Sequence, residues 1–400
     1  MSYTFAQRAE GLRSSAIRDL LKLTERDDVI SLAGGLPAPE SFPIDDLRRA
    51  TADVLDRQGP RAVQYSATDG VAELRAWLAA EHGAAVGRPI DVEGQIVVTH
   101  GSQQALDLLA KVLVDTGDVV VTESPAYLGA VQAIELFRPR FEVVPGDERG
   151  MRVDVLAERL DAGLRPRFVY VVANFHNPTG ATLSLDRRRH LAELADRYEL
   201  LIVEDDPYGS IRFAGDALPP IAAFTDRVVH LSTFSKIVAP GLRVGWMIGP
   251  PEVMARVARA KQAADLHTST FAQLALLELV SAPGWLEAQR ARIVPLYRER
   301  CERLAAALVE RLGERVSFTA PDGGMFLWTR WADVADTAAL LDRAIERGVA
   351  FVPGAAFTID GARDDHARLS FSTVDVGRVD EAVDRVAAAL ADLDRAHAAT

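Results

Sequence analysis

The sequence predicts an α/β protein: a mostly parallel central sheet with helices on both faces, followed by a smaller α+β part. The first observation is that short apolar runs rich in Val and Ile alternate with helical patterns between residues 96 and 248. Strands that are apolar throughout are typical of parallel sheets buried on both faces. The second observation is that this alternation stops after residue 312, where isolated strand patterns lie between amphipathic helices.

Six apolar runs are the expected strands of the central sheet, and stretches with helical spacing of apolar residues separate them. They are residues 96–100, 119–122, 167–173, 201–204, 228–231 and 244–248. Residues 251–312 are expected to be largely helical, with interruptions at Pro283 and Pro295. The last part is expected to hold a strand, a helix, a second strand and a closing helix at residues 324–329, 337–347, 368–372 and 377–396.

The N-terminal part predicts an amphipathic helix at residues 15–23, before a Gly- and Pro-rich stretch at residues 33–43. Neither a repeat nor a Gly/Ser linker separates the parts of the chain, so we expect them to be closely packed. The expected organisation is an N-terminal segment packed near the ligand pocket, a large α/β domain and a small α+β domain, at residues 1–44, 45–294 and 295–400.

Composition excludes several classes of protein. With 48% hydrophobic and 26% charged residues, the 400-residue chain is typical of a soluble globular protein. A formal net charge of −12 argues against a nucleic-acid partner, because such binding depends on clustered Lys and Arg. The single cysteine, Cys301, is typical of a reducing compartment. The N-terminus has no signal-like apolar stretch, and no run approaches the roughly 18 apolar residues of a membrane span. We therefore expect a cytoplasmic protein with no membrane partner.

Lysine is scarce in this chain, which makes its placement informative. The only lysines are Lys22, Lys111, Lys236 and Lys261. Three of them lie in helical, charge-mixed stretches, where a solvated side chain is expected. Lys236 instead follows the expected strand 228–231, in a loop with Thr233 and Ser235. An amine at the carboxyl end of a buried strand can lose its proton and attack a carbonyl carbon, although an ordinary loop lysine is the alternative.

Two stretches predict a phosphate site. Arg243 follows a Pro-Gly pair that can turn the chain back towards Thr233 and Ser235, and hydroxyls with a guanidinium bind phosphate well. The second stretch, Gly-Ser-Gln, opens a helix directly after the expected strand 96–100. Ser102 is expected to cap this helix, whose free amides and dipole favour an anion.

Polar residues also follow two other strands. Asn177 precedes Pro178, which favours an extended Asn and then a sharp turn. Asp205 and Asp206 follow the expected strand 201–204, where a buried carboxylate is costly unless it meets a cation. The alternatives are a surface turn and a solvated or helix-capping pair of aspartates. Taken together, these elements fit one ligand that carries an aldehyde, a phosphate and a ring nitrogen.

The order and spacing of several motifs identify a family resemblance. The motifs are residues 31–37, 64–66, 101–107, 177–180, 204–208, 235–245 and 323–326. Over nearly its whole length the chain resembles the fold-type I pyridoxal-phosphate aminotransferases, most of all the subgroup containing α-aminoadipate and kynurenine aminotransferases. This implies pyridoxal 5'-phosphate as cofactor, no metal, and a homodimer with shared active sites. Two departures, His176 where relatives often carry Gln and Thr233 where many have Ser, keep the ability to form hydrogen bonds.

The resemblance implies roles for the residues around the cofactor ring. Lys236 would bind the cofactor as a Schiff base and move the proton from the substrate Cα. Asp205 would pair with the ring nitrogen, because a protonated ring is the better electron sink. Asn177 and Tyr208 would hydrogen-bond the phenolic oxygen, and Tyr127 would stack on the ring.

The other implied contacts concern the phosphate and the substrate. The phosphate would be held by Ser102, Gln103, Thr233, Ser235 and Arg243, and by Tyr65 from the second subunit. Arg368 would bind the substrate α-carboxylate as a bidentate fork, with Asn177 and Gly35 beside it. Ser15 and Arg18, at the margin of the helix 15–23, would face the substrate side chain. For Arg18 the alternative is an exposed arginine paired with Asp19 or Glu25.

The implied reaction is the ping-pong transfer of an α-amino group from an amino acid to a 2-oxo acid. We expect a broad enzyme that uses 2-oxoglutarate and glutamate as one couple and accepts dicarboxylic or large apolar donors. One alternative is another enzyme with the same cofactor, a decarboxylase, lyase or amino-acid cyclase; Arg368 favours a reaction that retains the carboxylate. The other is the sensor domain of a transcription regulator, which needs a winged-helix segment before the core, whereas the resemblance here begins almost at residue 1.

Overall fold

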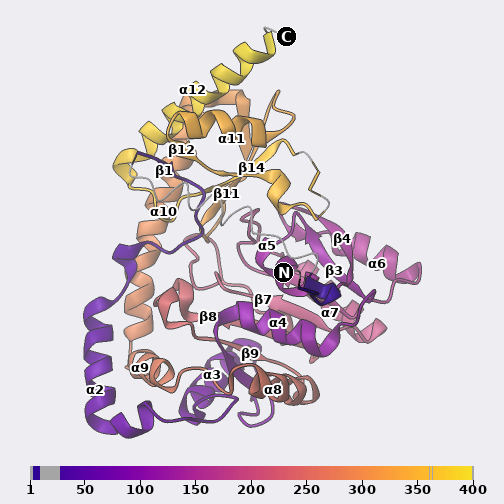
Figure 1. Ribbon diagram of the computed structural model, residues 1–400, viewed down its shortest axis with the longest axis vertical. Coiled ribbons are helices and arrows are strands. Elements are labelled where there is room, and N and C mark those ends of the chain that lie inside the picture. The colour runs from indigo at the N-terminus through magenta and orange to yellow at the C-terminus, as the bar shows by residue number, and fades with distance from the viewer. Residues whose placement is uncertain (1–2, 10–27, 360, 363, 399–400) are drawn as a thin grey trace.

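The computed structural model describes residues 3–9, 28–359, 361–362 and 364–398. The expected helix at residues 15–23, with Ser15 and Arg18, lies outside the described residues. Figure 1 shows two sheet-containing parts at opposite ends of the long axis, with β14, α11 and α12 in one and β8, β9, α4 and α8 in the other.

The larger part is built on an eight-stranded sheet with the order β2-β9-β8-β7-β6-β3-β4-β5. Neighbours from β8 to β4 pair in parallel, whereas β9 is antiparallel to both β2 and β8, and β5 is antiparallel to β4. The strands are β2 (Ile96–Thr99), β3 (Val119–Ser124), β4 (Arg140–Asp147), β5 (Gly150–Met151), β6 (Phe168–Val172), β7 (Ile202–Asp205), β8 (Val228–Thr233) and β9 (Gly245–Ile248).

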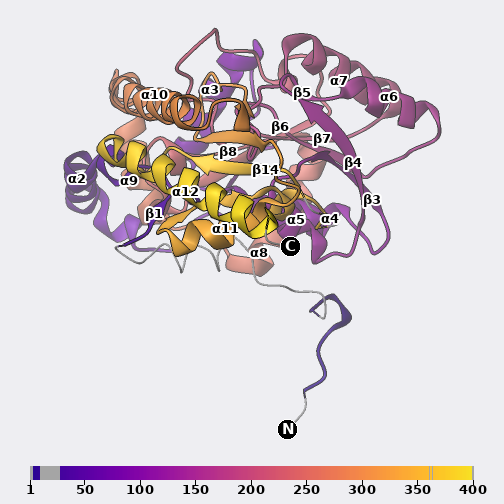
Figure 2. The same ribbon diagram turned by 90° about the horizontal axis from the view of Figure 1, so that it is seen from above.

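Helices cover both faces of this sheet, as Figure 2 shows with the sheet between α6 and α7 on one side and α4, α5 and α8 on the other. Alternate residues of β6 explain the two layers: Phe168, Tyr170 and Val172 face the core with α4, while Val169 and Val171 face the core with α6 and α7. The helices of this part are α2 (Ile44–Ala62), α3 (Ala72–Val86), α4 (Gly101–Leu113), α5 (Leu128–Glu135), α6 (Val153–Asp161), α7 (Leu185–Tyr198), α8 (Pro251–Asp265) and α9 (Thr270–Val280).

The smaller part is an antiparallel sheet of order β10-β11-β14-β13. Its strands are β10 (Val316–Phe318), β11 (Phe326–Trp331), β13 (Val352–Pro353) and β14 (His366–Ser370), and its helices are α11 (Thr337–Glu346) and α12 (Val379–Ala398). The pair Leu327 and Leu369 belongs to the core with α10 (Trp285–Leu312) and α12. The neighbouring pair, Trp328 and Arg368, therefore lies on the opposite face.

Short elements connect these units. A two-stranded parallel ladder, β1 (Ile30–Ser31) with β12 (Val349–Ala350), joins the N-terminal segment to the smaller part. The 3₁₀ helices are η1 (Gln7–Ala9), η2 (Pro39–Ser41), η3 (Ile221–Ala223), η4 (Phe234–Lys236), η5 (Pro240–Leu242), η6 (Gly313–Arg315), η7 (Gly354–Phe357) and η8 (Val376–Arg378). In the described part of the chain, no helix is long and apolar enough to span a membrane.

The predicted fold class is confirmed, and all six expected strands of the large sheet form within a few residues of their predicted ends. The prediction missed β4, because half-exposed residues and Pro145 interrupt its apolar pattern, and it missed the two-residue β5. The proposed domain boundary at residues 294/295 stays a prediction; it falls inside α10, which continues through Pro295.

Candidate active site

The carboxyl ends of the parallel strands open into one cavity of about 490 Å³. Ten predicted residues line it: Ser102, Gln103, Tyr127, Asn177, Asp205, Tyr208, Thr233, Ser235, Lys236 and Arg243. They lie at the ends of β7 and β8 or in segments that follow β2, β3, β6, β7 and β8, so the sheet brings together side chains more than a hundred residues apart. We call the buried set Asn177, Asp205, Tyr208, Thr233 and Ser235 the cavity floor.

Lys236 is placed by the 3₁₀ turn η4, which begins where β8 ends. Its Nζ donates a hydrogen bond of 2.9 Å to the carbonyl of Gly35 and lies 5.8 Å from the centre of the Tyr208 ring. Burial, together with the positive charges of Arg368 and Arg243, lowers the pKa of Lys236 to about 8. A larger fraction of this amine than of an ordinary lysine is therefore uncharged and nucleophilic near neutral pH.

Hydroxyl and guanidinium groups gather at one end of the cavity. Thr233 Oγ1 and Ser235 Oγ are 2.8 Å apart, and the Ser235 amide donates to Thr233 Oγ1. Arg243 donates to the carbonyl of His100, directly before α4. A Cβ on Gly101 would lie 2.9 Å from the Arg243 guanidinium, so only glycine lets the arginine come this close to the start of α4.

The prediction that Ser102 caps α4 is wrong. The helix begins at Gly101, and its N-cap is His100, whose amide donates to Gln104 Oε1 at 2.9 Å. Ser102 consequently lies inside the first turn, and its buried hydroxyl has no hydrogen-bond partner among the described residues. The hydroxyl is available for a ligand at the positive end of the helix.

A carboxylate faces the cavity at the end of β7. Asp205 is 1% exposed, and burial raises its pKa to about 7. Its Oδ2 accepts a hydrogen bond of 2.9 Å from the hydroxyl of Tyr170, while its Oδ1 has no partner within the described part of the chain. Such an oxygen in a buried site is suited to a ligand that brings its own proton.

These unpartnered atoms test whether the residues fit pyridoxal phosphate. The cavity offers a free hydroxyl beside Arg243, a free carboxylate oxygen on Asp205 and an amine of lowered pKa on Lys236. Those groups match a phosphate, a protonated ring nitrogen and an aldehyde, respectively. The residues therefore fit the cofactor that the sequence predicts.

Arg368, on β14, does not itself line the cavity but contacts Asn177, which does. Arg368 is 2% exposed and donates to Asn177 Oδ1 at 2.8 Å and to the carbonyl of Ala33 at 2.6 Å. Its guanidinium lies 4.4 Å from the centre of the Phe326 ring and 5.0 Å from that of Phe357. Burial lowers its pKa to about 10, and its Nε has no hydrogen-bond partner among described residues. Arg368 is thus a buried cation that has no carboxylate partner among the residues that the structure describes. Such a cation is suited to an anionic ligand.

The predicted residues at the edge of the site differ from the floor in exposure. Tyr65 is 78% exposed and does not line the cavity. The centres of the Tyr65 and His267 rings are 5.8 Å apart, in a T-shaped arrangement. Gly35 contributes its carbonyl to Lys236, and the adjacent Leu36 lines the cavity while remaining 55% exposed.

Some residues around the site were not predicted. Further cavity-lining residues are Leu106, Gln132, Val172, Pro207 and Pro240.

The expectation that Lys261 is solvated is wrong: it is 0% exposed and bonds both oxygens of Asp265, 2.8 and 2.7 Å away. Asp265 also accepts from Gln104, and its Oδ2 lies 2.7 Å from His100 Nδ1, so this buried network braces the start of α4. Only the spacing Lys-x-x-x-Asp on one helix hinted at it.

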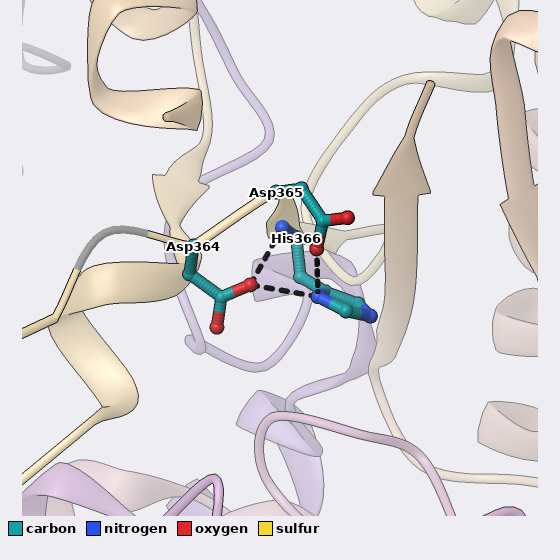
Figure 3. Close-up of side chains that lie close together, drawn as sticks. All are labelled: Asp364, Asp365 and His366. Carbon is teal, nitrogen blue, oxygen red and sulfur yellow. Dashed lines mark hydrogen bonds and ion pairs between the residues drawn. The ribbon is translucent and has the colours of Figure 1, made fainter. Parts of the chain in front are cut away.

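Figure 3 shows a second polar cluster, Asp364, Asp365 and His366, at the start of β14. His366 Nδ1 lies 2.7 Å from Asp364 Oδ1 and 2.8 Å from Asp365 Oδ1, and the imidazole stacks on Trp328. Because the histidine already partners both carboxylates, the cluster anchors the strand that carries Arg368 two residues later.

Comparisons with known proteins agree with this geometry. Residues 27–386 match the family model described as aminotransferase class I and II. The chain is 41% identical to the aromatic-amino-acid aminotransferase 1 of Thermococcus litoralis, over 96% of this chain and 93% of that protein. It is 40% identical to the 2-aminoadipate transaminase of Thermus thermophilus, over 98% of both chains. The structure of Pyrococcus horikoshii kynurenine aminotransferase with PMP superposes with a TM-score of 0.92, at 40% identity over 97% of both chains.

The match extends through both sheets and through every element that contributes to the cavity. It confirms the predicted resemblance to the aminoadipate and kynurenine subgroup, and with it the predicted cofactor. The chain therefore belongs to the class I and II aminotransferases and is a pyridoxal-phosphate-dependent enzyme that moves an amino group to a 2-oxo acid.

Proposed function

We propose that the protein transfers the α-amino group of dicarboxylic or large apolar amino acids to 2-oxoglutarate, by a ping-pong mechanism centred on Lys236. The observation that carries this proposal is the position of Lys236, an amine of lowered pKa in the cavity that Arg243 and Asp205 also line. The donor class is supported by relatives named for aromatic amino acids and for 2-aminoadipate.

Two residues would perform the proton chemistry. When bound, pyridoxal phosphate supplies the electron sink that makes the substrate Cα–H bond acidic. Lys236 Nζ would accept that proton and return it at the neighbouring carbon, which requires the uncharged amine that burial favours. Asp205 would hold the proton of the ring nitrogen through its free Oδ1.

The other residues of the site would bind and orient. Ser102, Gln103, Thr233, Ser235 and Arg243 would hold the phosphate. Tyr208 and Asn177 would hydrogen-bond the phenolic oxygen, with Tyr208 as donor because burial raises its pKa. Tyr127 would cover the ring of the cofactor. Because burial raises the pKa of the Tyr127 hydroxyl to about 12, this side chain would stay neutral.

Arg368 would bind the α-carboxylate of the substrate. Its guanidinium is desolvated between two aromatic rings, and Asn177 Oδ1 holds its orientation. A carboxylate in this place would supply the negative charge that the described surroundings of Arg368 lack. Gly35 would keep the approach open, since a Cβ there would lie 3.1 Å from the Phe326 ring.

The protein would act as a homodimer in which Tyr65 serves the phosphate site of the other subunit. The exposure of Tyr65 supports this, because 78% of the residue is open to solvent and it does not line the cavity of its own subunit. Val63, in the same loop, is 76% exposed, so a second subunit would cover apolar surface there.

Substrate choice is tested by a panel of amino donors with 2-oxoglutarate as acceptor, measuring kcat/KM for each. The proposal expects 2-aminoadipate, leucine and aromatic amino acids to be used, with glutamate as the product of the acceptor. Exclusive use of a small donor such as alanine would contradict the donor class. Release of carbon dioxide instead of a 2-oxo acid would contradict the retention of the carboxylate by Arg368.

A further inference from the structure

Tyr170 lies beneath the cavity, and the sequence pattern predicted no role for it. It is the third residue of β6 and is 1% exposed. In the parallel pairing with β7, Tyr170 is opposite Val203, and Val172 is opposite Asp205. Tyr170 and Val203 belong to the same core, and Asp205 follows Val203 by two residues, so all three side chains share one face of the sheet. This register carries the tyrosine hydroxyl diagonally to the carboxylate of Asp205.

The hydrogen bond from Tyr170 gives the two carboxylate oxygens of Asp205 different surroundings. Tyr170 donates to Asp205 Oδ2 at 2.9 Å and leaves Oδ1 without a partner in the described part of the molecule. Burial raises the pKa of Tyr170 well above its usual value, so the hydroxyl keeps the proton that it donates to the carboxylate. Conversely, the Tyr170 hydroxyl lowers the pKa of Asp205, against the larger effect of burial.

Other titratable groups surround Asp205, but their influence is less direct. Asp206, next on the chain, raises its pKa, and His230 on β8 lowers it. Tyr127 and Tyr208 also lie close enough to interact with its charge, and burial raises the pKa of both. His230 is paired with Glu204 on the opposite face, 3.4 Å away. Among the described residues, Tyr170 is thus the one side chain that donates a hydrogen bond to Asp205.

We propose that Tyr170 is a positioning residue that keeps Asp205 ionised and fixes its free oxygen towards the ring nitrogen of the cofactor. The inference rests on the role of Asp205 in the proposed function and adds a second residue to it. Tyr170 would not touch the cofactor. It would act through Asp205, by stabilising the carboxylate form that holds the proton on the nitrogen.

The test compares two cofactors in the Tyr170→Phe variant, which loses one oxygen and keeps the ring. One cofactor is pyridoxal phosphate; the other is an analogue with C–H in place of the ring nitrogen. Dissociation constants are measured by tryptophan fluorescence of the apoenzyme. We expect affinity for pyridoxal phosphate to fall about ten-fold, since a hydrogen bond to a charged group is lost, and affinity for the analogue to stay within about two-fold. With cofactor labelled at the ring nitrogen, the ¹⁵N chemical shift should move from the protonated towards the neutral position.

Two control variants separate the possible causes. Tyr198→Phe removes a tyrosine–aspartate hydrogen bond to Asp161 at the surface, and should leave both affinities and the ¹⁵N shift unchanged. Asp205→Asn should weaken binding of pyridoxal phosphate more than that of the analogue. Should Tyr170→Phe not fold, Tyr170→Met removes the same hydroxyl with a side chain that adapts to its surroundings, and the same comparison applies.

The outcomes distinguish this inference from the proposed function. Equal losses for both cofactors in Tyr170→Phe, with an unchanged ¹⁵N shift, would show that Tyr170 only packs the core and would overturn the inference. If Asp205→Asn discriminates between the cofactors while Tyr170→Phe does not, the inference fails and the role of Asp205 stands. If neither variant discriminates, the role of Asp205 fails, and the inference fails with it.

Discussion

The buried cavity floor and the exposed loop around Tyr65 differ in how firmly the packing of one chain fixes their residues. Every floor residue is at most 8% exposed and is set by the end of a strand, so its position follows from the packing of the sheet. Tyr65 and Val63 are more than 75% exposed and lie beyond the end of α2. In the proposed function, the residues of the cavity floor would therefore belong to one subunit, whereas Tyr65 would complete the phosphate site of the other.

The largest expected effect comes from removing the amine of Lys236, which lines the cavity. Lys236→Ala should abolish turnover, because no other described amine lines the cavity. Binding of pyridoxal phosphate should persist at reduced affinity, since the contacts around Arg243 remain. Stopped-flow turnover and equilibrium dialysis measure the two effects. Lys111→Ala, which removes an exposed lysine paired with Asp107, should behave as wild type. Residual turnover in Lys236→Ala above a few per cent of wild type would contradict the role.

The next effect concerns the carboxylate of Asp205, which would pair with the ring nitrogen of the cofactor. Asp205→Ala should slow turnover by about 10²–10⁴-fold, because leaving a buried charge without its partner costs roughly 3–5 kcal/mol. Single-turnover kinetics with saturating cofactor isolate this loss from weaker binding. The surface variant Asp154→Ala removes an exposed pair with Arg152 and should change little. Near-full activity of Asp205→Ala would show that Asp205 does not hold the proton on the ring nitrogen of the cofactor.

A smaller effect is expected from the exposed loop. Tyr65→Ala should raise the dissociation constant of the cofactor about ten-fold, because a hydrogen bond to a charged group is worth roughly 1.5–3 kcal/mol. At a cofactor concentration too low to saturate Tyr65→Ala, mixing this variant with Lys236→Ala should raise activity above that of either alone, since each mixed dimer would hold one complete site. Sedimentation equilibrium provides the control. A fully active monomer, or mixtures with no gain over either variant, would mean that the loop does not complete a neighbouring site.

The smallest effect concerns Arg18, which lies outside the described residues. Arg18→Ala should raise KM for dicarboxylic donors by about ten-fold and leave leucine nearly unchanged, because only the former offers a distal carboxylate. Steady-state kinetics with 2-aminoadipate and leucine test this. Equal changes for both donors would assign Arg18 a structural role and move the source of specificity to other residues.

The sequence allowed most of the floor to be predicted, and physical reasons explain what it left out. Asp205 and Lys236 could be found because polar residues directly after apolar strands must share one edge of a parallel sheet. Tyr170 could not, since a tyrosine inside an apolar strand is typical of a core residue, and only the register with β7 reveals its hydrogen bond. The burial of Lys261 was missed because it depends on the packing of α8 against α4.

The most direct test of the central claim is to find which lysine forms the covalent link to the cofactor. Borohydride reduction of the purified holoenzyme, followed by peptide mass spectrometry, fixes the cofactor on its lysine. We expect the label on Lys236, whose amine has a lowered pKa and lines the cavity. Lys261 is the informative competitor, because it is also buried but is held by Asp265. A label on Lys261, or on either other lysine, would contradict the account.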